Sequence, residues 1–431
     1  MRLSPLLVAA ALAAFAPAPA SLAQGSVPSP TPPATAAAAP AEARAPVTIL
    51  ISIDGFRADY LDRGVTPVLS RLAAGGVRAA MRPSFPSKTF PNHWTLVTGL
   101  RPDRNGIVAN RMEDAARPGE VFTMAVDDPF WWNEATPIWV DAERAGIRSA
   151  TMFWPGSNVA IGGTLTKGGH GGVEGGTRPS DWMQFNQAIT GPQRVNGILD
   201  WLRRPAAIRP RLLTLYFDTV DSAGHSYGPD DARTTRAVAE IDGQIGMLVD
   251  GLAALSQPAN LVIVADHGMA ATSSQRVVPL DSLVSLDAIH LVETGPYAAL
   301  TPLPGQEAAV EKALVGRHPH MECWRRQSVP VRFHYGQNPR IPAILCLAET
   351  GWLINEHAPT KPFSGGNHGY DHMSPEMAAV FIANGPAFRA GQQIKSFDNV
   401  DVYPLLRDLI GLAPRAGVDG TDAPFATVLA H

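Results

Sequence analysis

The sequence alternates between short apolar runs typical of buried strands and longer segments with the periodicity of helices. The runs at 47–53, 212–217 and 261–265 are rich in apolar and β-branched residues, as expected for strands buried on both faces. Between the second and third runs, apolar residues recur at spacings of three and four, which predicts one face of a long helix: Val238, Ile241, Ile245, Leu248 and Leu252.

The same alternation continues on either side of these runs. A helix is expected over 66–74, ending at Gly75-Gly76, and another over 400–412, with a further strand at 378–382. Strands that alternate with helices in this way form βαβ units. We therefore expect one doubly wound α/β domain with a mainly parallel sheet and helices on both faces.

Two stretches do not follow the alternation. The segment 162–176 is dense in glycine but lacks both glycine-rich phosphate-binding patterns, so its composition favours a flexible surface loop. The segment 273–346 has no clear period, and we expect it to add smaller β elements around the main sheet.

The chain has only two cysteines, Cys323 and Cys346. We expect a strand at 329–335, after Cys323, and another at 341–347, which contains Cys346. Adjacent strands would bring the two together. A disulfide is favoured over two buried thiols if the protein is exported, because oxidising compartments permit it.

The N-terminus has the pattern of an export signal. Arg2 precedes an apolar run at 6–15, and the small residues at 21–23 are typical of a cleavage site, which predicts a signal peptide at 1–23. The run is too short to span a bilayer. Residues 24–46 are rich in Ala and Pro and are expected to form a linker. We therefore expect a periplasmic or secreted protein with no stable membrane anchor.

Acidic and histidine residues follow the expected strands. Asp54 follows the first strand, Asp221 and His225 follow the second, Asp266-His267 follows the third, and His368 lies in a later glycine-containing loop. Functional groups collect at the carboxyl ends of parallel strands. Mixed nitrogen and oxygen ligands suit zinc better than calcium or magnesium. A lone Asp or His at any of these positions would more often be structural, so the prediction rests on the whole set.

A candidate nucleophile lies before an expected helix whose first turn contains Pro91. The hydroxyl of Thr89 would face the positive end of the helix dipole, where an anion is favoured. Thr89 alone would more often be a helix cap, and Ser84 and Ser87 are rivals on the same loop. The formal net charge of −4, without a run of like charge, gives no nucleic-acid-binding footprint.

Six motifs together resemble the nucleotide pyrophosphatase/phosphodiesterase family of the alkaline phosphatase superfamily. They occur in family order and cover the chain from Val47 onward: Ile53-Asp54-Gly55-Phe56-Arg57, Lys88-Thr89-Phe90-Pro91-Asn92-His93, Phe153-Trp154-Pro155-Gly156-Ser157, Asp221-Ser222-Ala223-Gly224-His225, Ala265-Asp266-His267-Gly268-Met269 and Gly366-Asn367-His368-Gly369-Tyr370. The resemblance implies an alkaline-phosphatase-like catalytic domain at 47–431, in the compact bacterial form.

The resemblance also implies a role for each matched residue. One zinc site would comprise Asp221, His225 and His368, and a second would comprise Asp54, Asp266 and His267, with Thr89 facing it as nucleophile and ligand. Asn110 would bind a phosphoryl oxygen, Phe90 and Phe185 would stack on a nucleobase, and Lys88 would contact substrate. His372 lies outside the matched motif and is a weaker ligand candidate than His368.

These roles imply a two-zinc phosphodiesterase or pyrophosphatase that forms a covalent threonine intermediate and releases nucleoside 5′-monophosphates. The same chemistry on lipid-derived or choline phosphodiesters is the main alternative, and a phosphomonoesterase is a weaker one, since no additional positive group is evident. A zinc-stabilised binding protein is disfavoured because every catalytic role is filled.

Overall fold

The apolar runs of the sequence form the centre of a nine-stranded sheet in the order β21-β2-β20-β10-β1-β9-β5-β8, with β22 paired to β2. The computed structural model describes residues 44–166 and 172–430. The strands are β1 (Val47–Ile53), β2 (Val77–Arg82), β5 (Ser149–Met152), β8 (Asp181–Met183), β9 (Leu212–Phe217), β10 (Ala259–Val264), β20 (Ala379–Asn384), β21 (Gln392–Gln393) and β22 (Phe397–Asp398).

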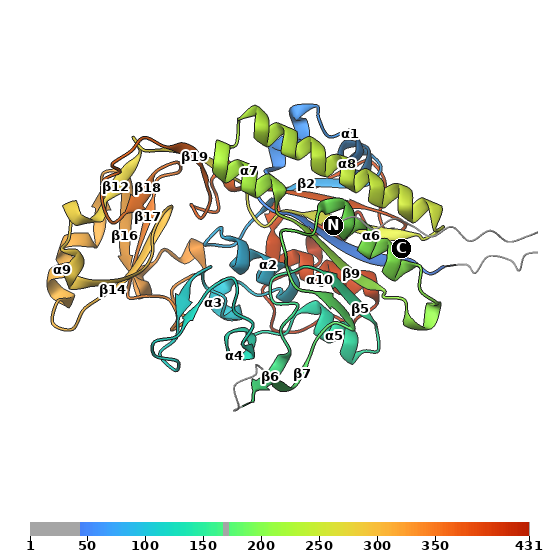
Figure 1. Ribbon diagram of the computed structural model, residues 1–431, viewed down its shortest axis with the longest axis horizontal. Coiled ribbons are helices and arrows are strands. Elements are labelled where there is room, and N and C mark those ends of the chain that lie inside the picture. The colour runs from blue at the N-terminus through green and yellow to red at the C-terminus, as the bar shows by residue number, and fades with distance from the viewer. Residues whose placement is uncertain (1–43, 167–171, 431) are drawn as a thin grey trace, which may run out of the picture. The chain divides into compact units, whose positions relative to one another are not determined.

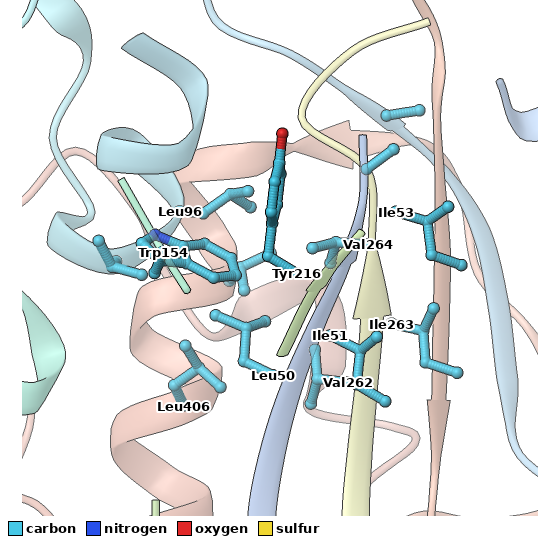
Figure 2. Packing of buried hydrophobic residues seen from close by; sticks show 14 of the residues in the cluster. Leu50, Ile51, Ile53, Leu96, Trp154, Tyr216, Val262, Ile263, Val264 and Leu406 are labelled. Carbon is cyan, nitrogen blue, oxygen red and sulfur yellow. The ribbon is translucent and has the colours of Figure 1, made fainter. Parts of the chain in front are cut away.

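Five neighbouring strands, β10, β1, β9, β5 and β8, run parallel to one another. Strand β20 runs antiparallel to both β10 and β2, which makes the sheet mixed but mainly parallel, as expected. Every residue of β1 and β9 is buried. Figure 2 shows side chains such as Leu50 and Ile51 of β1 packing with Val262 and Ile263 of β10.

Helices cover both faces of the sheet, which confirms the doubly wound α/β fold (Figure 1). One group lies on one face: α1 (Pro67–Ala74), α6 (Gly191–Leu202) and α8 (Ala232–Ala254). The other group lies on the opposite face: α2 (Thr89–Thr98), α5 (Ile138–Arg144) and α10 (Val402–Ile410). The expected apolar positions of α8 are buried, including Val238 and Leu248, because they form the face of the helix turned to the sheet.

A second, antiparallel sheet accounts for most of the segment without a clear period. It has the order β13-β14-β17-β16-β15 and has its own apolar core. Its elements are β13 (Ile289–Glu293), β14 (Tyr297–Pro302), α9 (Glu307–Leu314), β15 (Gly316–His318), β16 (Met321–Arg325) and β17 (Ile344–Ala348). Smaller strand pairs join β12 (Val277–Pro279) to β18 (Leu353–Asn355), and β11 (Ala270–Ser273) to β19 (Ser364–Asn367).

Cys323 and Cys346 form a disulfide, but not between the strands that the sequence predicts. Cys323 lies within β16, directly opposite Cys346 on β17. The expected strand at 329–335 is wrong, because this segment contains a short 3-10 turn, Val331–Phe333, that follows Pro330 and ends at a left-handed His334. Pro330 lacks the amide hydrogen that a sheet ladder needs, which accounts for the break.

The described ends of the glycine-rich segment are also more regular than a loop. Strands β6 (Ile161–Leu165) and β7 (Val173–Thr177) pair antiparallel as a hairpin. Gly176 has a φ of +74°, and a Cβ at this position would lie 2.5 Å from the Ala160 carbonyl oxygen, so a side chain there would collide with the backbone. The central residues 167–171 lie outside the described part of the chain, as do the expected signal peptide and most of the expected linker.

Among the described residues, no helix is both long and apolar enough to cross a membrane.

We predict that loss of the disulfide lowers the free energy of unfolding by about 2–4 kcal/mol, because the bond closes a loop between cysteines that are 23 residues apart. The test compares the Tm of the wild type, the wild type with reductant, and the double variant Cys323→Ala/Cys346→Ala. Reductant should lower the Tm of the wild type and leave the double variant unaffected. Equal Tm values for oxidised and reduced wild type would contradict the prediction.

Candidate metal centre and nucleophile

The acidic side chains converge because three adjacent parallel strands end at the same edge of the sheet. In the order β10-β1-β9, Asp266 follows β10, Asp54 follows β1, and Asp221 lies in the first turn of α7 (Thr219–Tyr227), just after β9. The amide of Asp54 donates to the carbonyl of Phe217 at 2.9 Å, which continues the β1–β9 ladder and places the carboxylate at the edge.

Asp54, Asp266 and His267 form the first cluster, and all three are buried. The Nε2 atom of His267 lies 2.9 Å from Asp266 Oδ2 and 3.5 Å from Asp54 Oδ1. Both oxygens are buried without a hydrogen-bond partner among the described residues. The other oxygen of each carboxylate is held, since Tyr216 donates to Asp54 Oδ2 at 2.7 Å and the Gly55 amide donates to Asp266 Oδ1 at 3.2 Å.

Asp221, His225 and His368 form the second cluster. Asp221 Oδ1 lies 3.4 Å from His225 Nε2 and 3.7 Å from His368 Nε2, and the two Nε2 atoms are 3.1 Å apart. The two clusters are adjacent, because the rings of His267 and His368 stack with centroids 3.4 Å apart. Asp221, His267 and His368 are also close enough together to share an ion.

All three histidines turn the same nitrogen inward. Their Nδ1 atoms lie 2.9 Å from backbone carbonyls: those of Gly366 for His225, Gly268 for His267 and Ser87 for His368. A carbonyl accepts a hydrogen bond, so each Nδ1 carries the proton and each Nε2 presents a lone pair. Two such lone pairs 3.1 Å apart require a cation or a proton between them.

The charges of the two clusters point to the same requirement. Burial raises the pKa of Asp54 well above its usual value, and repulsion from Asp266 and Asp221 raises it further. Burial, and then repulsion from Asp221, raises the pKa of Asp266 in the same way. Burial also lowers the pKa of His368. Divalent cations would satisfy the orphaned oxygens and the inward lone pairs, so the residues fit two metal ions.

Thr89 is the candidate hydroxyl that the structure brings to this centre. It is the first residue of α2, and its Oγ1 lies 3.2 Å from His267 Nε2. The rival hydroxyls are engaged elsewhere: Ser87 donates to the Tyr370 carbonyl at 2.8 Å, and Ser84 donates to Asn399 Oδ1 at 2.8 Å. His372 lies outside both clusters and packs edge-on against Phe333.

Asn110 and Lys88 lie on either side of Thr89 and have different surroundings. Asn110 Oδ1 accepts from the Phe90 amide at 2.9 Å, which leaves its Nδ2 as the side-chain donor for a ligand. Lys88 is buried, and burial lowers the pKa of its ammonium group while Glu293 and Asp221 oppose the shift. Its Nζ lies 5.8 Å from the centre of the Tyr297 ring, and Lys88 is not part of the cavity wall described next.

A cavity of about 470 Å³ opens beside Thr89, and both Phe90 and Phe185 line it. Phe185 is 47% exposed and rests edge-on against Phe153 and Tyr216. Phe90 packs against Phe122 and Trp132. The structure thus places both expected aromatic side chains in the wall of one cavity, together with Thr89.

Sequence reasoning missed two buried groups that support the centre. Tyr216 lies in an apolar strand run and was indistinguishable from core, yet its hydroxyl points away from the apolar packing in Figure 2 and holds Asp54. His93 is fully buried, with Nε2 2.8 Å from Ser52 Oγ and Nδ1 2.8 Å from the Thr89 carbonyl. Burial lowers the pKa of His93 to about 3, so it remains neutral. A polar residue inside a buried run is the signal that could have identified both.

Comparison with known proteins places this centre in a family. The model for type I phosphodiesterase/nucleotide pyrophosphatase matches residues 48–371. Bis(5′-adenosyl)-triphosphatase enpp4 of Xenopus laevis is 38% identical over 85% of this chain and 78% of its own length. Human ectonucleotide pyrophosphatase/phosphodiesterase family member 5 is 36% identical over 84% of this chain and 74% of its own length.

A solved structure agrees with these relatives. Murine ectonucleotide pyrophosphatase/phosphodiesterase 5, in an inactive threonine-to-alanine form bound to AMP, is 33% identical and superposes with a TM-score of 0.82. The match covers 90% of this chain and all of that one. The chain belongs to the type I phosphodiesterase/nucleotide pyrophosphatase family and is a hydrolase of that family.

Proposed function

We propose that this hydrolase cleaves phosphodiester or phosphoanhydride bonds of nucleotides and releases nucleoside 5′-monophosphates, with Thr89 as its nucleophile. The observation that carries the proposal is the position of the Thr89 hydroxyl, 3.2 Å from His267 Nε2, between the acidic clusters and an aromatic-lined cavity. An AMP-bound relative with an inactivating threonine-to-alanine change supports both the nucleophile and the ligand class.

We further propose that the metals are two zinc ions, because each cluster combines imidazole with carboxylate ligands. Asp54, Asp266 and His267 would hold one ion, and Asp221, His225 and His368 the other. When bound, the ions would lower the pKa of the Thr89 hydroxyl and neutralise charge on the phosphoryl group.

The residues of the chain then have distinct parts in the reaction. Thr89 Oγ1 attacks phosphorus, forming a new P–O bond as the bond to the leaving alcohol or phosphate breaks. Asn110 Nδ2 donates to a phosphoryl oxygen, and its own oxygen is held by the Phe90 amide. Water then attacks phosphorus and the bond from phosphorus to Thr89 Oγ1 breaks, which releases the nucleoside 5′-monophosphate and returns a proton to the Thr89 hydroxyl. Lys88, just outside the second cluster, supplies positive charge near the incoming anion.

We propose that the protein acts outside the cytoplasm. The disulfide between Cys323 and Cys346 is typical of oxidising compartments, and the N-terminal residues 1–23 have the pattern of an export signal. Relatives described as ectonucleotide enzymes support the same location.

The nucleophile is tested by Thr89→Ala, which should lower kcat at least about a thousandfold on any phosphodiester, because the neighbouring hydroxyls of Ser84 and Ser87 are engaged elsewhere. Thr89→Ser keeps the hydroxyl and should retain measurable turnover. Thr360→Ala, an exposed change of the same type, is the matched control. Metal content of each variant, by elemental mass spectrometry, separates loss of the nucleophile from loss of the metal. An active Thr89→Ala enzyme would sink the proposal.

The nucleotide assignment is tested by Phe90→Ala. Stacking of a base on an aromatic ring contributes roughly 1–3 kcal/mol, and this energy can orient the diester for attack. The preference for a 4-nitrophenyl nucleoside 5′-phosphate over bis(4-nitrophenyl) phosphate, measured as a ratio of kcat/KM, should therefore fall at least about fivefold.

Phe185→Ala should lower the same ratio, and Phe363→Ala, which lies outside the cavity, should not. Unchanged ratios in both cavity variants would make the two rings packing residues only. Faster release of choline phosphate from glycerophosphocholine than of AMP from ATP would contradict the nucleotide assignment and favour choline phosphodiesters as substrates.

A further inference from the structure

The cavity follows the carboxyl edge of the sheet, so the strand order gives the order of subsites along it. Metal ligands lie at the ends of β10, β1 and β9. Further along the edge, Phe153 to Gly156 after β5 and Phe185 after β8 line the same cavity. A nucleotide whose phosphate lies at the metal centre and whose base lies at Phe185 must therefore place its sugar above the β9–β5 part of the edge.

Asp218 occupies this intermediate position. It directly follows β9, lines the cavity, and lies three residues before the metal ligand Asp221. Its side chain is 17% exposed, so it is accessible to a ligand but largely surrounded by protein. Neither the metal clusters nor the nucleophile uses it.

Hydrogen bonds from Arg194 and Gln187 hold the carboxylate of Asp218 in one orientation. The buried Arg194 donates from Nη1 to Asp218 Oδ1 at 2.8 Å and to the Tyr216 carbonyl at 3.0 Å. Gln187 donates to Asp218 Oδ2 at a longer 3.3 Å. Both oxygens of Asp218 already accept hydrogen bonds from these side chains, and their remaining lone pairs can accept further ones. The group is therefore suited to a ligand that presents hydroxyl donors.

We propose that Asp218 binds the ribose hydroxyls of the substrate and makes the enzyme selective for ribonucleotides over 2′-deoxyribonucleotides. The proposal rests on the nucleotide function proposed above. The 2′ and 3′ hydroxyls of ribose form a pair of adjacent donors, and a carboxylate accepts such donors in charge-assisted hydrogen bonds. A deoxyribonucleotide lacks the 2′ hydroxyl, so one lone pair of the Asp218 carboxylate would remain without a hydrogen-bond donor.

The sharpest test uses two substrates that differ only in the 2′ hydroxyl: the 4-nitrophenyl 5′-phosphates of 5-methyluridine and thymidine. In the wild type, kcat/KM for the ribonucleotide should exceed that for the deoxyribonucleotide roughly tenfold, the value of a hydrogen bond to a charged group. Asp218→Asn, which retains the shape but not the charge, should reduce this ratio to about one to threefold. Asp200→Asn, an exposed change in α6 outside the cavity, should leave the ratio at its wild-type value.

Each result bears on one claim. A wild-type ratio near one overturns the ribose proposal, whether or not the variant folds. A wild-type ratio that Asp218→Asn retains assigns the selectivity to another group and also overturns the proposal. Bis(4-nitrophenyl) phosphate distinguishes failure of the nucleotide function from failure of the ribose-binding role of Asp218. If wild-type enzyme prefers it to both nucleoside esters, the nucleotide function itself fails, and the role of Asp218 with it.

Discussion

Everything at this site depends on carboxylate oxygens that are buried without a hydrogen-bond partner and on imidazole nitrogens that face inward beside them. Within 44–166 and 172–430, Asp54 Oδ1, Asp266 Oδ2 and Asp221 Oδ1 have no hydrogen-bond partner, and the Nε2 atoms of His225 and His368 face each other at 3.1 Å. Burying such groups unpaired is costly, and only cations of high charge relieve both the carboxylates and the imidazoles. Metal binding would offset the free-energy cost of burying these groups.

The rest of the structure holds this arrangement in place. Parallel strands β10, β1 and β9 bring the carboxylates to one edge, and backbone carbonyls orient each histidine of the two clusters. Tyr216 connects the metal centre to the cavity, because its hydroxyl holds Asp54 while its ring supports Phe185. The candidate metal centre and the cavity therefore meet at the end of β9, which Asp218 directly follows.

The sequence predicted the features that depend on local pattern. The strand runs, the helix at α8 and the acidic strand ends follow from periodicity, and the motif set led to the family. Long-range facts were less accessible. The disulfide between Cys323 and Cys346 was expected, but the strand expected at 329–335 is absent because Pro330 interrupts it, and Cys323 lies in the preceding strand β16. The role of Tyr216 was not evident because it lies within an apolar run. The hairpin β6–β7 was not evident because its strands are rich in glycine.

The most direct test of the account is anomalous X-ray scattering from crystals of the protein as purified, measured on both sides of the zinc absorption edge. A two-zinc centre should give two zinc peaks. One peak should lie among Asp54, Asp266 and His267, next to Thr89 Oγ1, and the other among Asp221, His225 and His368. A single peak, or two peaks that disappear without loss of activity when the metal is chelated, would contradict it.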